Sequence, residues 1–348
     1  MTDKLTIAHL IRVTPHRAGI YETARDLASA ERALGHEARM VDPYGMAEDR
    51  GVPIGRDDFV ASCDVIVNHS GLGAYEQSGK PVVHIMHGRP HSSFLLELQG
   101  KVAVYRFLVG AANDPKYSAF VTLWPEFVPY WKLIIQNRPI HVVTPPVDLS
   151  TWKADGPRGY SFHGRAGEIN VVCADMWRED RDPYHVINGF WHFAKAHPGA
   201  KLHLYATNAK SPGLNVLLAA LKSIHALGEV CGYIRGLDNV YRAADALITP
   251  HRIATRSVRE ALACGCTVVA ANGNPAATIT GDVESPVDYA RAISVAVDGV
   301  HSKTLRSDNR SVAEANFDSM KSATELVEVI RGVLSGAPQS ELVTQCIA

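Results

Sequence analysis

The chain has 348 residues, 46% of them hydrophobic and 20% charged, and its 35 basic and 36 acidic residues give a net charge of −1. This length predicts two domains of similar size, and the ordinary apolar fraction excludes an intrinsically disordered chain. The balanced charge argues against a general nucleic-acid coat or a polybasic membrane binder. We see no apolar run long enough for a transmembrane segment and no secretion signal, so we expect a cytoplasmic protein.

Short runs rich in valine and isoleucine alternate along the chain with segments of helical periodicity. The first half is expected to contain a helix at 20–34 and strands at 6–13, 38–41, 64–68, 81–86, 119–123 and 141–144. The second half is expected to contain strands at 169–174, 201–206, 229–233, 246–249 and 267–271, and helices at 185–196, 214–227, 240–244 and 256–263. Apolar strands that alternate with helices are typical of parallel sheets covered on both faces, so we predict an α/β fold with two such sheets.

A segment rich in glycine and proline, residues 145–167, separates the two series of elements. It has no apolar periodicity, which indicates a connection between domains. We therefore expect domains at 1–150 and 151–311, an amphipathic helix at 312–335 and a tail at 336–348. The functional residues should lie at the carboxyl ends of the two sheets, in a cleft between them.

The six cysteines are scattered and form no Cys-x-x-Cys pair. Most of them lie in apolar surroundings, where cysteine usually behaves as a small core residue. This usage indicates a reducing compartment and no structural zinc site.

The turn before the first expected helix contains Gly19. Glycine lets a ligand approach the backbone closely, and the N–H groups at the start of a helix attract anions. Basic side chains precede the turn: Arg12, His16 and Arg17. A tight turn with solvated basic residues explains the same pattern.

Two histidines lie in the strand expected at 81–86 or directly after it. His84 is inside the strand, where a hydrogen-bonded core residue is the simpler interpretation. His87 follows the strand at its carboxyl end, where it can orient or deprotonate a hydroxyl group.

A charged loop follows the first strand of the second half. Its two arginines, Arg178 and Arg181, can clamp a diphosphate through fixed charge-assisted hydrogen bonds. They can equally pair with the acidic residues of the same loop, which are Glu179, Asp180 and Asp182.

The helix expected at 256–263 carries Glu260. A carboxylate at this position is either solvated or accepts both hydroxyls of a ribose, at roughly 1.5–3 kcal/mol for each charge-assisted hydrogen bond. The N–H groups of Thr255, Arg256 and Ser257 stand at the helix N-terminus, where they can bind phosphate.

Four segments together resemble the retaining glycosyltransferases of the GT-B fold, of the family 4 type, also called glycosyltransferase group 1. They are a glycine turn and helix ending in Gly35-His36-Glu37, the pair His87-Gly88, Pro145-Pro146-Val147-Asp148, and a signature that runs from Gly232 to Ala270. The resemblance implies two Rossmann-like parallel-sheet domains that face a cleft, with a C-terminal helix that crosses back to the first domain.

The resemblance also implies the roles of the site residues. Those assigned to donor binding are Gly19, His251, Arg252, Thr255, Arg256, Ser257 and Glu260, and those assigned to catalysis are His87, Arg178 and Arg181. Glu260 would bind the ribose of a nucleoside-diphosphate sugar, which is a co-substrate. The reaction would proceed with retention and need neither a metal nor a cofactor.

This chain departs from the family pattern at the sugar-binding end of the signature. Arg252 stands where the family has its first glutamate, and Ala254-Thr255 replaces the usual glycine pair. The basic residues that hold the diphosphate align with Met176 and Arg181, which leaves Arg178 as a substitute. Arg252 indicates either a donor or acceptor with a negative group, or a loss of activity.

The acceptor stays open among a glycan, a lipid and a modified nucleobase of DNA. The amphipathic segment 127–138 either packs on the sheet or contacts a membrane-borne acceptor. A basic mouth that suits nucleic acid, an acceptor that we do not favour, would consist of Arg12, Arg17, Arg252, Arg256 and Arg259. The alternative functions are a non-catalytic protein that binds a nucleotide sugar or glycan, and a sugar-nucleotide epimerase.

Overall fold

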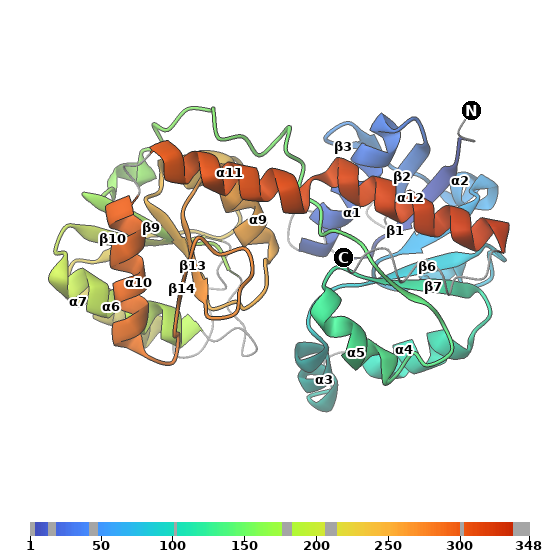
Figure 1. Cartoon of the computed structure of the whole chain (residues 1–348), viewed down its shortest axis with the longest axis horizontal. Coiled ribbons are helices and arrows are strands. Elements are labelled where there is room, and N and C mark those ends of the chain that lie inside the picture. Colours follow the sequence, from blue (N-terminus) through green and yellow to red (C-terminus); the bar gives the residue numbers. More distant parts are fainter. Residues whose placement is uncertain are drawn as a thin grey trace. The chain divides into compact units, whose positions relative to one another are not determined.

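The computed structural model describes residues 4–12, 19–41, 48–100, 103–175, 183–205, 214–299 and 303–336. The chain divides into two compact units, one formed by residues up to Asp148 together with those from Phe317 onward, the other by Leu149–Asn316. Each unit contains a six-stranded parallel sheet with helices packed around it (Figure 1). The predicted α/β class with two parallel sheets is therefore confirmed.

The first unit has the strand order β2-β1-β5-β6-β7-β8. Its strands are β1 (Thr6–Leu10), β2 (Glu37–Val41), β5 (Val65–Asn68), β6 (Val82–Met86), β7 (Tyr117–Thr122) and β8 (Ile140–Val142). After β2 the chain crosses to the other side of β1, so the strand order reverses between β1 and β5. In open α/β sheets, ligands bind beyond the carboxyl ends of the strands at such a switch point.

Helices cover both faces of this sheet. They are α1 (Gly19–Ala33), α2 (Asp57–Ser62), α3 (Pro90–Leu98), α4 (Val104–Asn113), α5 (Val128–Lys132) and α12 (Ser319–Ser335), with short turns η1 (Gly73–Tyr75) and η2 (Pro125–Phe127) and the small hairpin β3 (Glu48–Asp49) and β4 (Val52–Pro53). Figure 1 shows α12 alongside α1. Trp131 of α5 is buried in the hydrophobic core, and Ile134 packs against the same core. Tyr130 and Leu133 are exposed. One face of the 127–138 segment therefore packs on the sheet.

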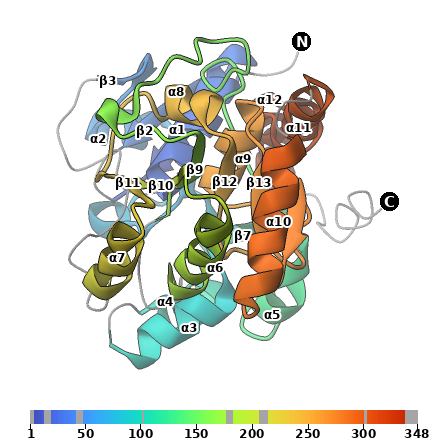
Figure 2. The ribbon, with the colours of Figure 1, turned by 90° about the vertical axis from the view of Figure 1, so that its left-hand side faces the viewer.

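The second unit has the strand order β11-β10-β9-β12-β13-β14, which reverses between β9 and β12. Its elements are η3 (Phe162–Gly164), β9 (Ile169–Cys173), α6 (Pro183–Ala196), β10 (Ala200–Leu204), α7 (Leu214–Ser223), β11 (Leu227–Val230), α8 (Leu237–Ala243), β12 (Ala246–Ile248), α9 (Arg256–Ala263), β13 (Val268–Ala271), β14 (Ile279–Gly281), α10 (Pro286–Gly299) and α11 (Lys303–Phe317). Figure 2 shows α6 and α10 side by side over one face of the sheet.

The helix predicted at 214–227 is too long, because α7 ends at Ser223. His225 has a left-handed φ of 56°, and the Ala226 N–H turns back to the Leu221 carbonyl at 2.9 Å. These are features of a Schellman-type helix end. The chain consequently enters β11 at Leu227, and this strand ends at Val230 instead of at 233.

The single helix predicted at 312–335 is two helices in the structure, α11 and α12. Asp318 lies between them with a ψ of 122°, and its side chain accepts a hydrogen bond from the Met320 N–H at 2.9 Å. It therefore caps a new helix. Of these two helices, α12 belongs to the first unit, in agreement with the prediction that a C-terminal helix crosses back to the first domain. None of the helices in the described ranges is long and apolar enough to cross a bilayer.

Candidate functional site

The switch point of the second sheet is organised by Asp175, which follows β9. Its Oδ2 accepts a hydrogen bond from Thr249 Oγ1 at 2.7 Å, and Thr249 follows the neighbouring strand β12. Its Oδ1 lies 3.2 Å from His251 Nε2 and 3.3 Å from Ser257 Oγ. All four side chains are buried. One carboxylate thus joins the ends of two strands to the first turn of α9.

The N-terminus of α9 carries three of the predicted donor-binding residues. Thr255 occupies the N-cap position, and its hydroxyl lies 3.0 Å from Ser257 Oγ. Arg256 Nε donates to Glu260 Oε1 at 2.5 Å, one helical turn further on. Glu260 is only 6% exposed, so its carboxylate is buried on α9 and is not turned into bulk solvent. This placement brings Thr255, Arg256, Ser257 and Glu260 together on one short helix.

The loop before α9 is held in place by hydrogen bonds to its backbone carbonyls. Asn274 Nδ2 donates to the carbonyls of His251 and Ile253 at 3.0 and 2.9 Å. His251 is buried against Asp175, whereas the Arg252 side chain is exposed. The structure therefore presents Arg252 on a loop that is fixed on both sides.

Three further predicted site residues remain, which are Arg178, Arg181 and Gly19. Arg178 and Arg181 lie outside the described residues. Gly19 is the exposed first residue of α1.

In the first unit, His87 begins a chain of hydrogen-bonded side chains that we call the histidine chain. His87 Nε2 lies 2.9 Å from His69 Nδ1, His69 Nε2 lies 3.0 Å from His9 Nδ1, and His9 Nε2 lies 2.7 Å from Glu31 Oε2. His9 and Glu31 are completely buried, His69 is 4% exposed and His87 is partly exposed. The histidine chain therefore leads from the end of β6 into the core.

The register of the sheet explains why the three rings meet. His9 pairs with Val67 of β5, and Val67 pairs with Val83 of β6. Side chains alternate along a strand, so His69 and His87 project to the same face as His9. Each ring lies further toward the carboxyl end than the previous one, on the next strand across the switch point. Glu31 reaches His9 from α1.

His84 belongs to the opposite face of β6. Its Nδ1 lies 3.1 Å from Asn68 Nδ2, and its ring contacts Phe107 of α4 with the ring centroids 5.1 Å apart. Burial lowers the pKa of His84 to about 4. The sequence interpretation of His84 as a hydrogen-bonded core residue is confirmed.

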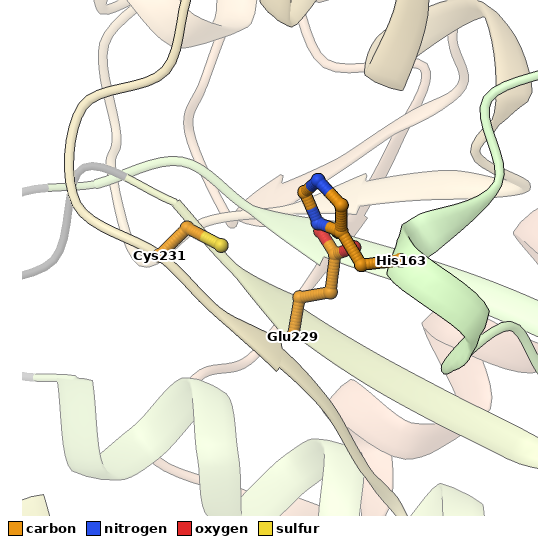
Figure 3. A group of neighbouring side chains, drawn as sticks. All are labelled: His163, Glu229 and Cys231. Atoms are coloured by element: carbon orange, nitrogen blue, oxygen red, sulfur yellow. Dashed lines mark ion pairs between the residues drawn. The ribbon is translucent and has the colours of Figure 1, made fainter.

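A second cluster of polar side chains lies at the edge of the other sheet (Figure 3). His163 of η3, Glu229 of β11 and Cys231 offer ligand atoms that all lie within 4.8 Å of one another. His163 Nδ1 contacts Glu229 Oε1 at 2.5 Å, and Glu229 Oε2 accepts hydrogen bonds from Tyr160 and Tyr205. A zinc ion bonds nitrogen and oxygen ligands at about 2 Å each, so it would have to separate His163 from Glu229. In the structure these two side chains contact each other directly instead.

Comparison of the sequence with protein families finds no match, and comparison with curated proteins finds none either. The structure, in contrast, is similar to solved glycosyltransferases. Anabaena Alr3699/HepE in complex with UDP-glucose has a TM-score of 0.72 and 14% identity, over 94% of this chain and 100% of that one. Sucrose-phosphate synthase from Thermosynechococcus elongatus has a TM-score of 0.68 and 15% identity, over 95% and 99%.

An alpha-glucosyltransferase in complex with UDP-glucose and DNA containing an abasic site is also similar, with a TM-score of 0.64 and 10% identity, over 94% of this chain and 100% of that one. At such identities the likeness establishes the fold, and the chain has the GT-B glycosyltransferase fold that its sequence predicted. Family 4 membership, retention and a cytoplasmic location stay predictions.

Sequence reasoning missed Asp175, His69, His9 and Glu31. The signal for the histidines was partly present, since His69 directly follows the strand predicted at 64–68 and His9 lies inside the strand predicted at 6–13. It could be recognised only once the order of the strands was known.

Proposed function

We propose that this chain is a glycosyltransferase that moves a sugar from a nucleoside-diphosphate sugar to a hydroxyl group of an acceptor. The observation that carries the proposal is the buried position of Glu260 on α9, whose first turn bonds to Asp175 at the switch point of the second sheet. The likeness of the whole chain to glycosyltransferases crystallised with UDP-glucose supports it.

In this proposal the donor is bound by α9 and the loops next to it. Glu260 accepts the two ribose hydroxyls, and Arg256 keeps the carboxylate in place through its hydrogen bond to Oε1. The N–H groups of Arg256 and Ser257, at the start of α9, bind a phosphate, because the first N–H groups of a helix point away from its own carbonyls. The Thr255 N–H instead donates to the Ile253 carbonyl at 2.8 Å. His251 and Arg252 stand next to the sugar, and Gly19 lets a ligand approach the start of α1.

The chemistry requires positive charge near the leaving diphosphate. When its bond to the anomeric carbon breaks, the diphosphate keeps the electron pair and gains negative charge. We propose that Arg178, Arg181 and the N–H groups of α9 stabilise this charge, so that no metal is required. The acceptor oxygen then bonds to the anomeric carbon from the face that the diphosphate leaves, which gives retention. His87 positions the acceptor.

The test of donor binding is calorimetric titration of the purified chain with UDP. We expect binding by the wild type and none by Glu260→Ala, because each lost charge-assisted hydrogen bond costs roughly 1.5–3 kcal/mol. Glu284→Ala, which removes an exposed carboxylate of the same unit, is the matched control and should bind as the wild type does. Unchanged binding by Glu260→Ala would overturn the assignment of the ribose site.

Mass spectrometry separates the alternative functions. Incubation with UDP-glucose and with a panel of other donors should add a sugar to an acceptor, whereas an epimerase leaves the donor mass unchanged. A non-catalytic relative binds the donor and changes neither. Glycans, lipids and DNA with a hydroxymethylated base form the acceptor panel, and NMR of the anomeric proton in the product tests retention.

A further inference from the structure

The histidine chain has no part in donor binding, yet it connects the partly exposed His87 with a fully buried carboxylate. We propose that His87, His69, His9 and Glu31 form a proton relay, which takes the proton of the acceptor hydroxyl at His87 and stores it on Glu31. This role rests on the proposed glycosyl transfer and adds the group that receives the proton in that reaction.

When Glu31 is ionised, one direction follows for every hydrogen bond of the histidine chain. An ionised Glu31 accepts from His9 Nε2–H at 2.7 Å, which leaves the neutral His9 with a lone pair on Nδ1. His9 Nδ1 then accepts from His69 Nε2–H, and His69 Nδ1 accepts from His87 Nε2–H. In this state all three rings carry their proton on Nε2, and Nδ1 of His87 is basic.

A proton that arrives at His87 reverses the whole series. The O–H bond of the acceptor breaks and a bond to Nδ1 of His87 forms. His87 passes its Nε2 proton to His69 Nδ1, His69 passes its Nε2 proton to His9 Nδ1, and His9 passes its Nε2 proton to Glu31 Oε2. The three rings end neutral with their proton on Nδ1, and Glu31 ends as a neutral carboxylic acid. One proton enters and one negative charge disappears.

Glu31 stands at the fully buried end of the histidine chain. Among the described residues, Glu31 Oε1 has no hydrogen-bond partner, and Oε2 is hydrogen-bonded to His9. Burial lowers the pKa of His69 well below its usual range, so the middle ring transfers protons without holding a charge.

Other titratable groups lie next to the histidine chain. His84 is near His69, and the pKa of His36 responds to Glu31 and to Arg331 of α12. Because His36 and His84 are not hydrogen-bonded to the three rings, variants of them separate a general electrostatic effect from proton transfer.

NMR of the protein labelled with 15N-histidine tests the relay without any substrate. We expect His9 and His69 to change together from the Nε2–H to the Nδ1–H tautomer as the pH falls, with both rings staying neutral. In Glu31→Gln the amide still bonds to His9 but cannot take up a proton, so this joint change should disappear. Tautomers of His9 and His69 that stay the same from alkaline to acid pH would overturn the proposal.

Kinetic measurements with an established donor and acceptor test whether the relay takes part in sugar transfer. Glu31→Gln and His69→Gln should lower kcat by about 100-fold, as expected for lost proton transfer, with KM for the donor unchanged. Protonation of Glu31 before the reaction blocks the relay, so an acid limb in the pH profile of the wild-type kcat should be absent in Glu31→Gln. His84→Gln, the same change in a buried histidine outside the chain, should keep both kcat and the acid limb.

The two proposals fail in different ways. If the wild type transfers sugar, and Glu31→Gln keeps its kcat and its acid limb, the relay is wrong and the glycosyltransferase stands. If the wild type transfers no sugar to any acceptor and does not bind UDP, the proposed function is wrong, and with it the role of the relay in transfer. The tautomer experiment then still decides whether the proton path exists.

Discussion

Thr249 Oγ1 donates a hydrogen bond of 2.7 Å to Asp175 Oδ2 and so ties the end of β12 to the end of β9. These strands are neighbours at the point where the order of the second sheet reverses. Because Ser257 of α9 bonds to the same carboxylate, the position of the helix N-terminus depends on it. Asp175 is thus a positioning residue of the proposed donor site.

Asp175→Ala should weaken the binding of UDP and lower stability. The change leaves three buried polar groups without their shared acceptor, at a cost of about 1–3 kcal/mol for an unsatisfied group. Each 1.4 kcal/mol lost from binding is about tenfold in Kd. Calorimetric titration and urea denaturation measure the two effects. Asp155→Ala, at an exposed position of the same unit, is the control. The role of Asp175 is refuted if the variant binds UDP with wild-type affinity.

The sequence predicted most strands because their apolar runs are local features. It missed β14 and α10: β14 spans only three residues, and its place in the sheet comes from pairing with β13. It also missed the break at Asp318, since α11 and α12 have continuous helical periodicity on either side of a single capping residue. The short strand β14 depends on a distant partner and the break at Asp318 on one backbone angle, and a local sequence pattern records neither.

The candidate site shows the same limit. The position of Glu260 on a helix followed from the local pattern, and so did the position of His87 after a strand. Asp175 stands at the start of a charged loop and looks like a solvated residue until β9 and β12 are known to be neighbours. The histidine chain joins three strands and a helix, so no short motif records it.

Tyr289→Phe should destabilise the second unit and disturb the same switch point. The Tyr289 hydroxyl accepts from the Thr249 N–H at 3.1 Å and donates to the Thr249 carbonyl at 2.9 Å, in a fully buried environment. Phenylalanine keeps the ring but removes the donor to the buried Thr249 carbonyl, whereas the Thr249 N–H keeps its hydrogen bond to the Val269 carbonyl at 3.0 Å. The free energy of unfolding should therefore fall by about 1–3 kcal/mol. Chemical denaturation measures it. Tyr184→Phe, at a largely exposed tyrosine, should have a smaller effect, and equal effects would argue against our explanation.

The second unit should lose stability in acid through His203. The Glu229 N–H donates to His203 Nδ1 at 3.1 Å, and His203 Nε2 lies 3.1 Å from Asn170 Oδ1, so the neutral ring uses both nitrogens. Burial lowers the pKa of His203 from 6.5 to about 3. The unfolded chain therefore binds a proton that the folded chain rejects. The stabilisation is complete above pH 6.5 and is lost as the pH falls from there toward 3.

The measurement is the free energy of unfolding as a function of pH. Each pKa unit corresponds to about 1.4 kcal/mol, so the loss attributable to this ring is of the order of a few kcal/mol. His203→Gln should show a shallower decrease in acid than the wild type, although its stability at neutral pH is lower. His91→Gln, at an exposed histidine, should keep the wild-type slope. An unchanged slope in His203→Gln would show that other groups cause the acid sensitivity.

Asp318→Ala should destabilise the junction of α11 and α12. The Asp318 side chain accepts from the Met320 N–H at 2.9 Å, and loss of an N-cap residue costs about 0.5–2 kcal/mol. Val147 fixes the same junction, because its N–H donates to the Phe317 carbonyl at 2.7 Å and its carbonyl accepts from the Ser319 N–H at 3.2 Å. Asp318→Asn should retain most of the stability, since asparagine caps helices about as well as aspartate. Thermal denaturation of both variants distinguishes a capping role from a purely electrostatic one, for which Asp318→Asn would be as unstable as Asp318→Ala.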